Sequence, residues 1–248
     1  MNVLPRLLYL FQNIPVELPK EKFQELDKLI SRFIWQGKKP RIRFKTLQLA
    51  KDKGGLSLPN IKNYYQAVHI KILVNICNPS YKAKWKDIEC QISSDIPLQA
   101  IIGDSGLVNS LKDTNPLIKM SIKIWHRVVK ENKAKEPYRV IRWIGYDSEF
   151  LPNKMDARFK QWADKGLIKH SDLYEGGTLR QFHDLKSRFG LTNQDFYRYL
   201  QLRHYLDKIM RKEELQQTNS HIVKIFLLAY RSDPEHGNIS KIYKVLKR

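Results

Sequence analysis

Apolar residues recur at steps of three and four positions along most of this chain, and this spacing is typical of helices that pack one face on a core. A clear example starts at Lys20 and ends at Gly37. Its predicted buried face carries Phe23, Leu26, Ile30, Phe33 and Ile34. We therefore predict a mainly α fold in which irregular connections join the helices.

Residues that favour helix ends mark where several of these helices begin. Asn60 and Asn115 suit the N-cap position, Pro116 suits the first turn, and Thr192 with Asp195 three residues later resembles a capping box. The aromatic segment 137–152 is irregular, and a short strand fits there. The predicted helices cover 4–11, 20–36, 61–76, a short stretch around Trp85, 117–128, 156–166, 178–189, 192–206 and 221–230.

The helical pattern weakens between Asn78 and Asn115, where prolines and glycines interrupt it. We read this part as a connection between two helical regions. The predicted organisation is a small helical bundle over 1–78, an irregular connection over 79–115 and a second helical region over 116–248.

The chain is strongly basic, with 45 Lys and Arg residues against 25 Asp and Glu residues, a formal net charge of +20 and a pI of about 9.8. The excess is spread through both halves, so it is not a basic tail on a neutral domain. Hydrophobic residues make up 42% of the chain, which is enough for a core and argues against disorder. These observations favour a polyanion, nucleic acid above all, as the partner.

The densest charge lies between the second and third predicted helices, where five cations fall within eight residues. Ile42 and Phe44 alternate with them, and Trp35, Tyr64 and Tyr65 flank the segment. Lys and Arg can neutralise phosphates while apolar and aromatic groups pack on sugars or stack on bases. The aromatic residues themselves are more often part of a core than of a binding platform. The alternative interpretation is a solvated face without a ligand. The candidate nucleic-acid contacts are Lys38, Lys39, Arg41, Arg43 and Lys45, with Lys51 and Lys53 as outer contacts.

No catalytic or metal-binding pattern stands out in the sequence. Cys77 and Cys90 lack a histidine pair at ligand spacing, the histidines are scattered singly, and neither an Asp-Asp pair nor a phosphate-binding Gly-rich loop occurs. We expect no enzyme activity, no cofactor and no metal site. The first residues lack a basic leader and a small-residue cleavage site, and no apolar run is long enough to span a membrane. The expected location is nuclear or cytoplasmic, not secreted.

Residues 179–206 also admit a helix-turn-helix interpretation, in which the second helix would enter a major groove. Two helices joined by a Gly190 break are, however, common in any helical domain. The second helix offers only Arg198 and Arg203 as cations.

An ordered series of short segments points to a particular family. It comprises MNVLPRLLYLFQNIP at 1–15, FIW at 33–35, GGLSLPN at 54–60, YYQA at 64–67, NP at 115–116, IW at 124–125, FLPN at 150–153, DARFK at 156–160 and DFYRYLQLR at 195–203. The series resembles the reverse transcriptase of long interspersed, non-LTR retrotransposons. It matches the thumb, which follows the catalytic palm, and the region downstream of the thumb.

The resemblance implies a thumb-like helical bundle that grips a template-primer duplex, followed by a helical wrist-like region. The family's metal-binding aspartates lie in the palm, upstream of the part that this chain resembles. We therefore expect a non-catalytic fragment of an RNA-directed DNA polymerase that binds RNA/DNA hybrid or duplex with weak sequence preference. The missing polymerase domains are candidate partners, and the palm would pack on the first helix around Leu7, Leu8 and Phe11.

An alternative from another class is a non-enzymatic interaction protein, derived from a retrotransposon remnant, whose helices pack on a protein partner. The charge would then serve solubility or nuclear import, and Lys38, Lys39, Pro40 and Arg41 resemble an import signal. Unlike duplex binding, that function would tolerate loss of Lys51 and Lys53.

Overall fold

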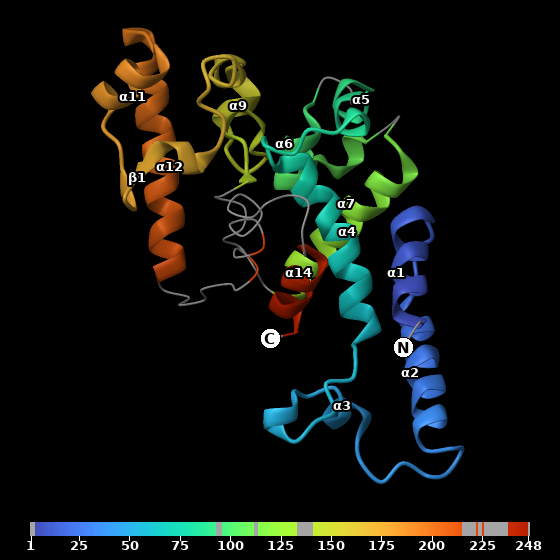
Figure 1. Ribbon diagram of the computed structural model, residues 1–248. Helices are drawn as coiled ribbons and strands as arrows, with labels where there is room; N and C mark the ends of the chain where they lie inside the picture. Colours follow the sequence, from blue (N-terminus) through green and yellow to red (C-terminus); the bar gives the residue numbers. More distant parts are fainter. Residues whose placement is uncertain are drawn as a thin grey trace.

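The mainly α fold predicted from the sequence is confirmed in a computed structural model, which describes residues 3–92, 96–111, 114–132, 141–214, 222, 225 and 238–247. Figure 1 shows the helices gathered in two groups, with a lobe projecting below them. Among the described helices, none is both long and apolar enough to cross a membrane.

The first group is built around α4, Ile61–Cys77, which is apolar around most of its circumference and is buried along most of its length. It packs on α1, Val3–Asn13, α2, Lys20–Ile34, α7, Pro116–Glu131, and α14, Asn238–Leu246. The helix α6, Leu98–Gly103, and the 3-10 helix η2, Ser105–Ser110, cover one end of this core. The short helix α5, Lys84–Ile92, lies beside them (Figure 1).

Two of these helices begin as the capping residues predict. The Asn60 side chain accepts a hydrogen bond from the Asn63 backbone N–H at 3.0 Å, and the Asn115 side chain accepts one from the Leu117 N–H at 2.9 Å. Each bond satisfies a donor that the first helical turn leaves free. Pro116 occupies the first turn of α7, where its missing N–H costs nothing.

The second group has its own core around Phe150, Phe159 and Trp162. Its long helix is α12, Phe196–Glu214, which follows the 3-10 helix η5, Asn193–Asp195, and the predicted Thr192 and Asp195 capping box. The remaining elements are η3, Ile144–Tyr146, α9, Pro152–Met155, α10, Arg158–Gln161, η4, His170–Leu173, β1, Tyr174–Glu175, β2, Thr178–Leu179, and α11, Phe182–Phe189.

Two predicted helices of this group are wrong in extent. Thr178 does not begin a helix, because it pairs with Glu175 in an antiparallel hairpin, and α11 starts only at Phe182. Gly176 and Gly177 both have positive φ, as a two-residue hairpin turn requires. The helix expected over 156–166 is reduced to α10, and turns follow it.

The C-terminal part was the least predictable. The helix expected over 221–230 lies outside the described residues, except that Ile222 and Ile225 are buried in the first core. The helix α14 was not predicted, yet it packs on α4.

The two buried cores do not follow the ranges predicted as domains. α4, α6, α7 and α14 share one core, although they belong to the predicted parts 1–78, 79–115 and 116–248. The second core lies within 144–206. Whether the predicted ranges fold separately stays a prediction.

Candidate nucleic-acid interface

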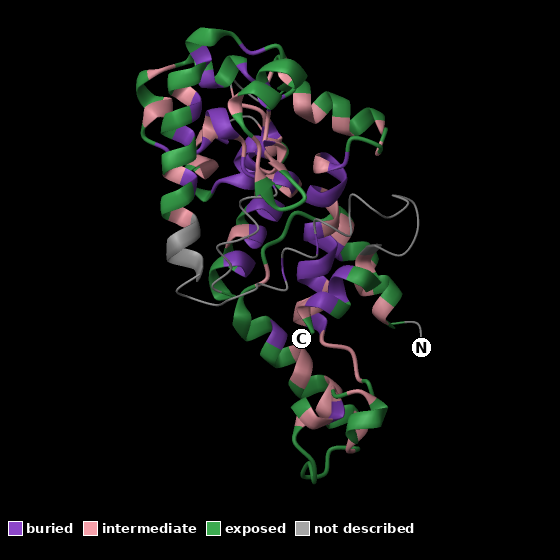
Figure 2. Ribbon diagram, turned by 90° about the vertical axis from the view of Figure 1, so that its left-hand side faces the viewer, coloured by how far each residue is buried: buried purple, intermediate pink, exposed green. Residues whose placement is uncertain are grey.

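Residues 36–60, which we name the basic lobe, project from one end of the molecule between α2 and α4 (Figure 1). The lobe contains the single-turn helix α3, Phe44–Leu47, and the 3-10 helix η1, Lys51–Lys53. Figure 2 shows that most of its residues are exposed. The segment singled out by its charge is therefore also the one most separated from both cores.

The lobe begins at a sharp end of α2. Gln36 and Gly37 both have positive φ, at 50° and 78°. The Gly37 N–H donates to the Arg32 carbonyl at 2.9 Å and the Gln36 N–H to the Phe33 carbonyl at 3.3 Å. These two bonds form a Schellman motif, which ends a helix and turns the chain away from its axis.

A small set of backbone bonds holds the rest of the lobe together. The Leu47 carbonyl accepts from the N–H groups of Leu56 and Leu58, both at 3.0 Å, while Leu49 accepts from Ser57 at 2.8 Å. Leu47 is buried beneath this crossing. The Gly55 backbone passes so close to Leu49 that an added Cβ would lie 2.2 Å from its carbonyl oxygen. The cations are thus carried on a folded loop.

All seven predicted contact residues are exposed. None of them forms an ion pair with an acidic residue in the part of the chain that the structure describes. Asp52 is the only acidic residue between Gln36 and Asn60. The structure brings together the following cations on the lobe: Lys38, Lys39, Arg41, Arg43, Lys45, Lys51 and Lys53.

The two tyrosines that flank this charge, Tyr64 and Tyr65, pack on the first core, so they are core residues rather than a base-stacking platform. Tyr65 is buried, and its hydroxyl donates to the Val16 carbonyl at 3.1 Å. Tyr64 stacks on Tyr243. The apolar groups exposed near the cations include Phe33 at the end of α2, with 85% of its surface accessible, and Ile42.

A row of lysines on α14 was missed in the sequence. Lys241, Lys244 and Lys247 are exposed, and α14 packs on the N-terminal part of α4, next to the lobe. Their regular spacing of three residues was the available signal. This spacing alone does not predict a binding surface, because nothing in the local sequence places residues 241–247 beside residue 60.

A second polar cluster links the two cores, away from the lobe. The buried Asp147 carboxylate accepts hydrogen bonds from Arg142 Nη1 at 2.8 Å, His170 Nε2 at 2.9 Å and the Tyr205 hydroxyl at 3.0 Å. Burial by itself raises the pKa of Asp147, but the hydrogen bond from His170 and the charge of Arg142 outweigh it and leave this pKa below its ordinary value.

This cluster is built as a structural junction. Asp104 accepts from the backbone N–H and the hydroxyl of Ser148 at 2.7 and 2.9 Å, and so ties η2 to the segment that holds Asp147. Burial raises the pKa of Tyr205, and the neighbouring Asp147 raises it further, so the phenol stays protonated and donates. Both carboxylates accept from several protein donors, which is typical of structural buried charges.

Burial also keeps two further titratable groups, His69 and Cys77, in their neutral forms. Burial lowers the pKa of His69 to about 4 and raises the pKa of Cys77 to about 12, so the first stays neutral and the second stays a thiol. Within the described ranges, no group of three or more His, Cys, Asp or Glu side chains could hold a metal ion.

The two cations on which the helix-turn-helix interpretation depends, Arg198 and Arg203, both have acidic neighbours. The Arg198 guanidinium pairs with Asp156 at 2.6 Å and with Asp195 at 3.2 Å. Arg203 lies 4.0 Å from Asp207. Both cations of the second helix within 192–206 therefore lie next to a carboxylate.

No protein-family model matches this chain.

Proposed function

We propose that this protein binds nucleic-acid duplex, including RNA/DNA hybrid, through the basic lobe and without catalysing a reaction itself. One observation carries the proposal: seven exposed cations share a projecting folded loop that holds a single acidic residue. Solvated charge on a helical protein is usually interleaved with acids, whereas the lobe holds only Asp52. A polyanion is the ligand that best matches such a surface.

The lobe is suited to phosphates and poorly suited to reading bases. Its only α-helix, α3, spans four residues, so no helix of the lobe could enter a major groove and present several side chains to base edges. Arg41 and Arg43 can each hold a phosphate with two N–H groups, while the lysines act as point charges. We therefore expect weak sequence preference and a strong dependence of affinity on salt.

The resemblance to the thumb of a non-LTR reverse transcriptase supports the same proposal. In this interpretation the chain is a fragment of an RNA-directed DNA polymerase that grips duplex behind an active site. The order of a helix, a basic connection and a buried helix agrees with it. Primer extension with Mg²⁺ or Mn²⁺ should be absent, since the chain does not carry the aspartate motif of the palm.

The test compares the salt dependence of duplex binding between two variants of equal charge. Replacing Lys38, Lys39, Arg41, Arg43 and Lys45 with Ala should flatten the slope of log K against log salt by about 3 to 5 units, because each lost phosphate contact removes about 0.9. A suitable control replaces Lys82, Lys84, Lys119, Lys123 and Lys154. Lys86 is unsuitable because its Nζ donates to the Asn78 and Tyr81 carbonyls at 2.6 and 3.2 Å.

Binding to a fluorescent RNA/DNA hybrid, followed by anisotropy over a range of salt concentrations, gives both slopes. The control should lose much less affinity than the lobe variant. Equal losses would mean diffuse attraction by the net charge of +20, and the role assigned to the lobe would be abandoned.

A second candidate is a protein-interaction module, and the outer face of α1 favours it. Phe11 is buried in the first core, and Leu7 and Leu8, which are also expected to meet the palm, are partly buried against it. Val3, Tyr9 and Leu10 are exposed on this helix. If Val3→Ser with Leu10→Ser raises solubility and leaves hybrid binding unchanged, this face is separate from the nucleic-acid interface.

A further inference from the structure

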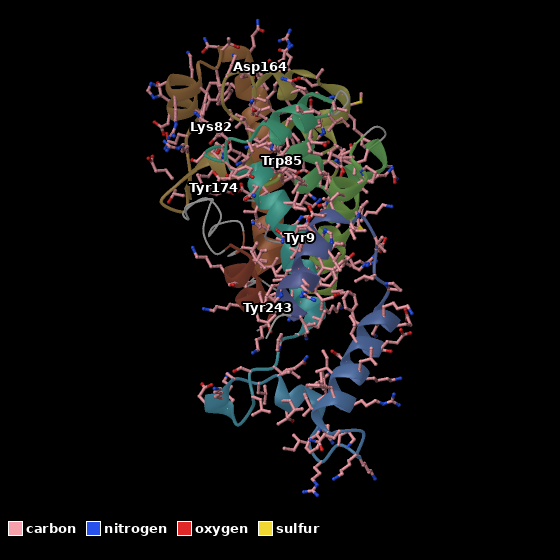
Figure 3. The ribbon with its side chains drawn as sticks, turned by 45° about the vertical axis from the view of Figure 1, so that its right-hand side comes forward. Tyr9, Lys82, Trp85, Asp164, Tyr174 and Tyr243 are labelled. Atoms are coloured by element: carbon pink, nitrogen blue, oxygen red, sulfur yellow. The ribbon has the colours of Figure 1, made fainter. Side chains whose placement is uncertain are left out.

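Three contacts place α14 at the neck of the basic lobe, where the lobe joins α4. The Asn60 backbone N–H donates to the Tyr243 hydroxyl at 3.1 Å, and Asn63 Nδ2 donates to the Leu246 carbonyl at 3.2 Å. The rings of Tyr64 and Tyr243 stack at 3.9 Å. In Figure 3 the labelled Tyr243 lies just above the lobe, and Figure 1 shows α14 above the lobe that contains α3. A segment near the end of the sequence is thus fastened beside residues 36–60.

The helix α14 has two distinct faces. Ile242, Tyr243 and Val245 are buried in the first core, whereas the lysines point outward at regular steps of three. No acidic residue occurs in this helix, and the described residues provide no ion-pair partner for these lysines. The outward lysines are Lys241, Lys244 and Lys247.

The stability of α14 explains why lysine occurs at some positions of this row but not at all of them. Lys244 lies in the last turn of α14 and Lys247 directly follows it, where positive charge is favourable next to the negative end of the helix dipole. Lys241 lies in the first turn, where positive charge is unfavourable and an acid would stabilise the helix. Its presence there is consistent with a ligand rather than with folding.

We propose that Lys241, Lys244 and Lys247 form a second row of phosphate contacts that continues the basic lobe across its neck. This inference rests on the proposed function. Successive lysines of the row are about 4.5 Å apart along the helix axis, since each residue of a helix rises about 1.5 Å. Phosphates of one strand advance about 3.4 Å per nucleotide along a duplex. The row can therefore follow two or three neighbouring phosphates while the lobe holds others.

The experiment measures hybrid binding against salt for a variant in which the three α14 lysines are replaced by Ala. We expect the slope of log K against log salt to flatten by about 2 to 3 units, since each lost phosphate contact removes about 0.9. The matched control removes three lysines of another helix, Lys119, Lys123 and Lys130 of α7, and should flatten it by less than about 1 unit.

A second α14 variant, with Arg in place of each of the three lysines, keeps the charge and guards against a folding defect. It should keep the wild-type slope, and a flattened slope in this variant would overturn the proposal. If the lobe variant flattens the slope and the α14 Ala variant does not, the second row is refuted while the proposed function stands. If neither variant changes it, both proposals fail.

Discussion

The ring centroids of Tyr64 and Tyr243 lie 3.9 Å apart, and the ring planes are within 14° of parallel. The first turn of α4 is therefore stacked against α14, the last described helix of the chain. The Tyr243 hydroxyl also accepts the hydrogen bond from Asn60, the residue that caps α4. One side chain thus fixes α14, the start of α4 and the neck of the basic lobe.

Replacing Tyr243 with Ala should lower the free energy of unfolding by about 3 to 5 kcal/mol, because a large buried ring is removed. Tyr243→Phe should cost about 1 kcal/mol, since only the acceptor for the Asn60 N–H is lost. Urea unfolding followed by circular dichroism measures both. Tyr197→Ala serves as the control, because Tyr197 is 75% exposed and should change stability by less than about 0.5 kcal/mol.

Asp147→Asn should be strongly destabilising, by about 3 to 5 kcal/mol, because it leaves the buried Arg142 without its main counter-charge. The measurement is the same denaturant titration. Glu149→Gln is the matched control: its carboxylate is exposed and lies 3.6 Å from the same guanidinium, so its loss should cost under about 1 kcal/mol. Equal effects of the two changes would contradict the structural role given to Asp147.

His69 should make the fold sensitive to acid. Ser121 Oγ donates to the Leu117 carbonyl, so His69 Nδ1–H donates to Ser121 Oγ at 3.0 Å and the buried Nε2 is the unprotonated nitrogen. The pKa of His69 is about 4 in the folded chain and 6.5 in the unfolded chain. At pH values between 4 and 6.5, the unfolded chain therefore binds a proton at His69 that the folded chain does not. Stability is therefore fully present above pH 6.5 and falls as the pH drops towards 4.

The loss across this window should be about 3 kcal/mol, at about 1.4 kcal/mol for each unit of pKa difference. Denaturant titrations at several pH values between 7 and 4 would measure it. His69→Gln should be less stable at pH 7 but should show a clearly smaller decline over the same window. An unchanged decline in that variant would assign the acid sensitivity to other groups.

Gly55→Ala should unfold the basic lobe locally, because its Cβ would lie 2.2 Å from the Leu49 carbonyl oxygen. Amide hydrogen exchange at Leu56, Ser57 and Leu58 should accelerate, since these groups lose their backbone acceptors. Exchange in α4 should stay unchanged, because its buried contacts lie outside the lobe. Gly54→Ala should have a smaller effect than Gly55→Ala, because its Cβ would lie in open space and the only cost is the positive φ of residue 54.

Features that depend on neighbouring residues were predictable. The helices α1, α2, α4 and α7 follow from apolar spacing. The starts of α4 and α7 follow from Asn60, Asn115 and Pro116, because capping bonds join residues two or three positions apart. The exposure of the seven lobe cations follows in the same way, since charged side chains in a connection with a single acid, Asp52, stay in water.

By itself, the sequence determined the helical class, the starts of α2, α4 and α7, and the position of the densest positive charge. Only the tertiary structure decided which residues surround that charge. Tyr64 and Tyr65 are aromatic residues that flank the basic segment in the sequence. In the fold, the Tyr64 ring stacks on Tyr243 and the Tyr65 ring packs against Phe11, two residues that are distant in the sequence. The Asp147 cluster and the lysines of α14 were hidden for the same reason. Contacts between distant segments depend on how whole helices pack, and local periodicity does not contain that information.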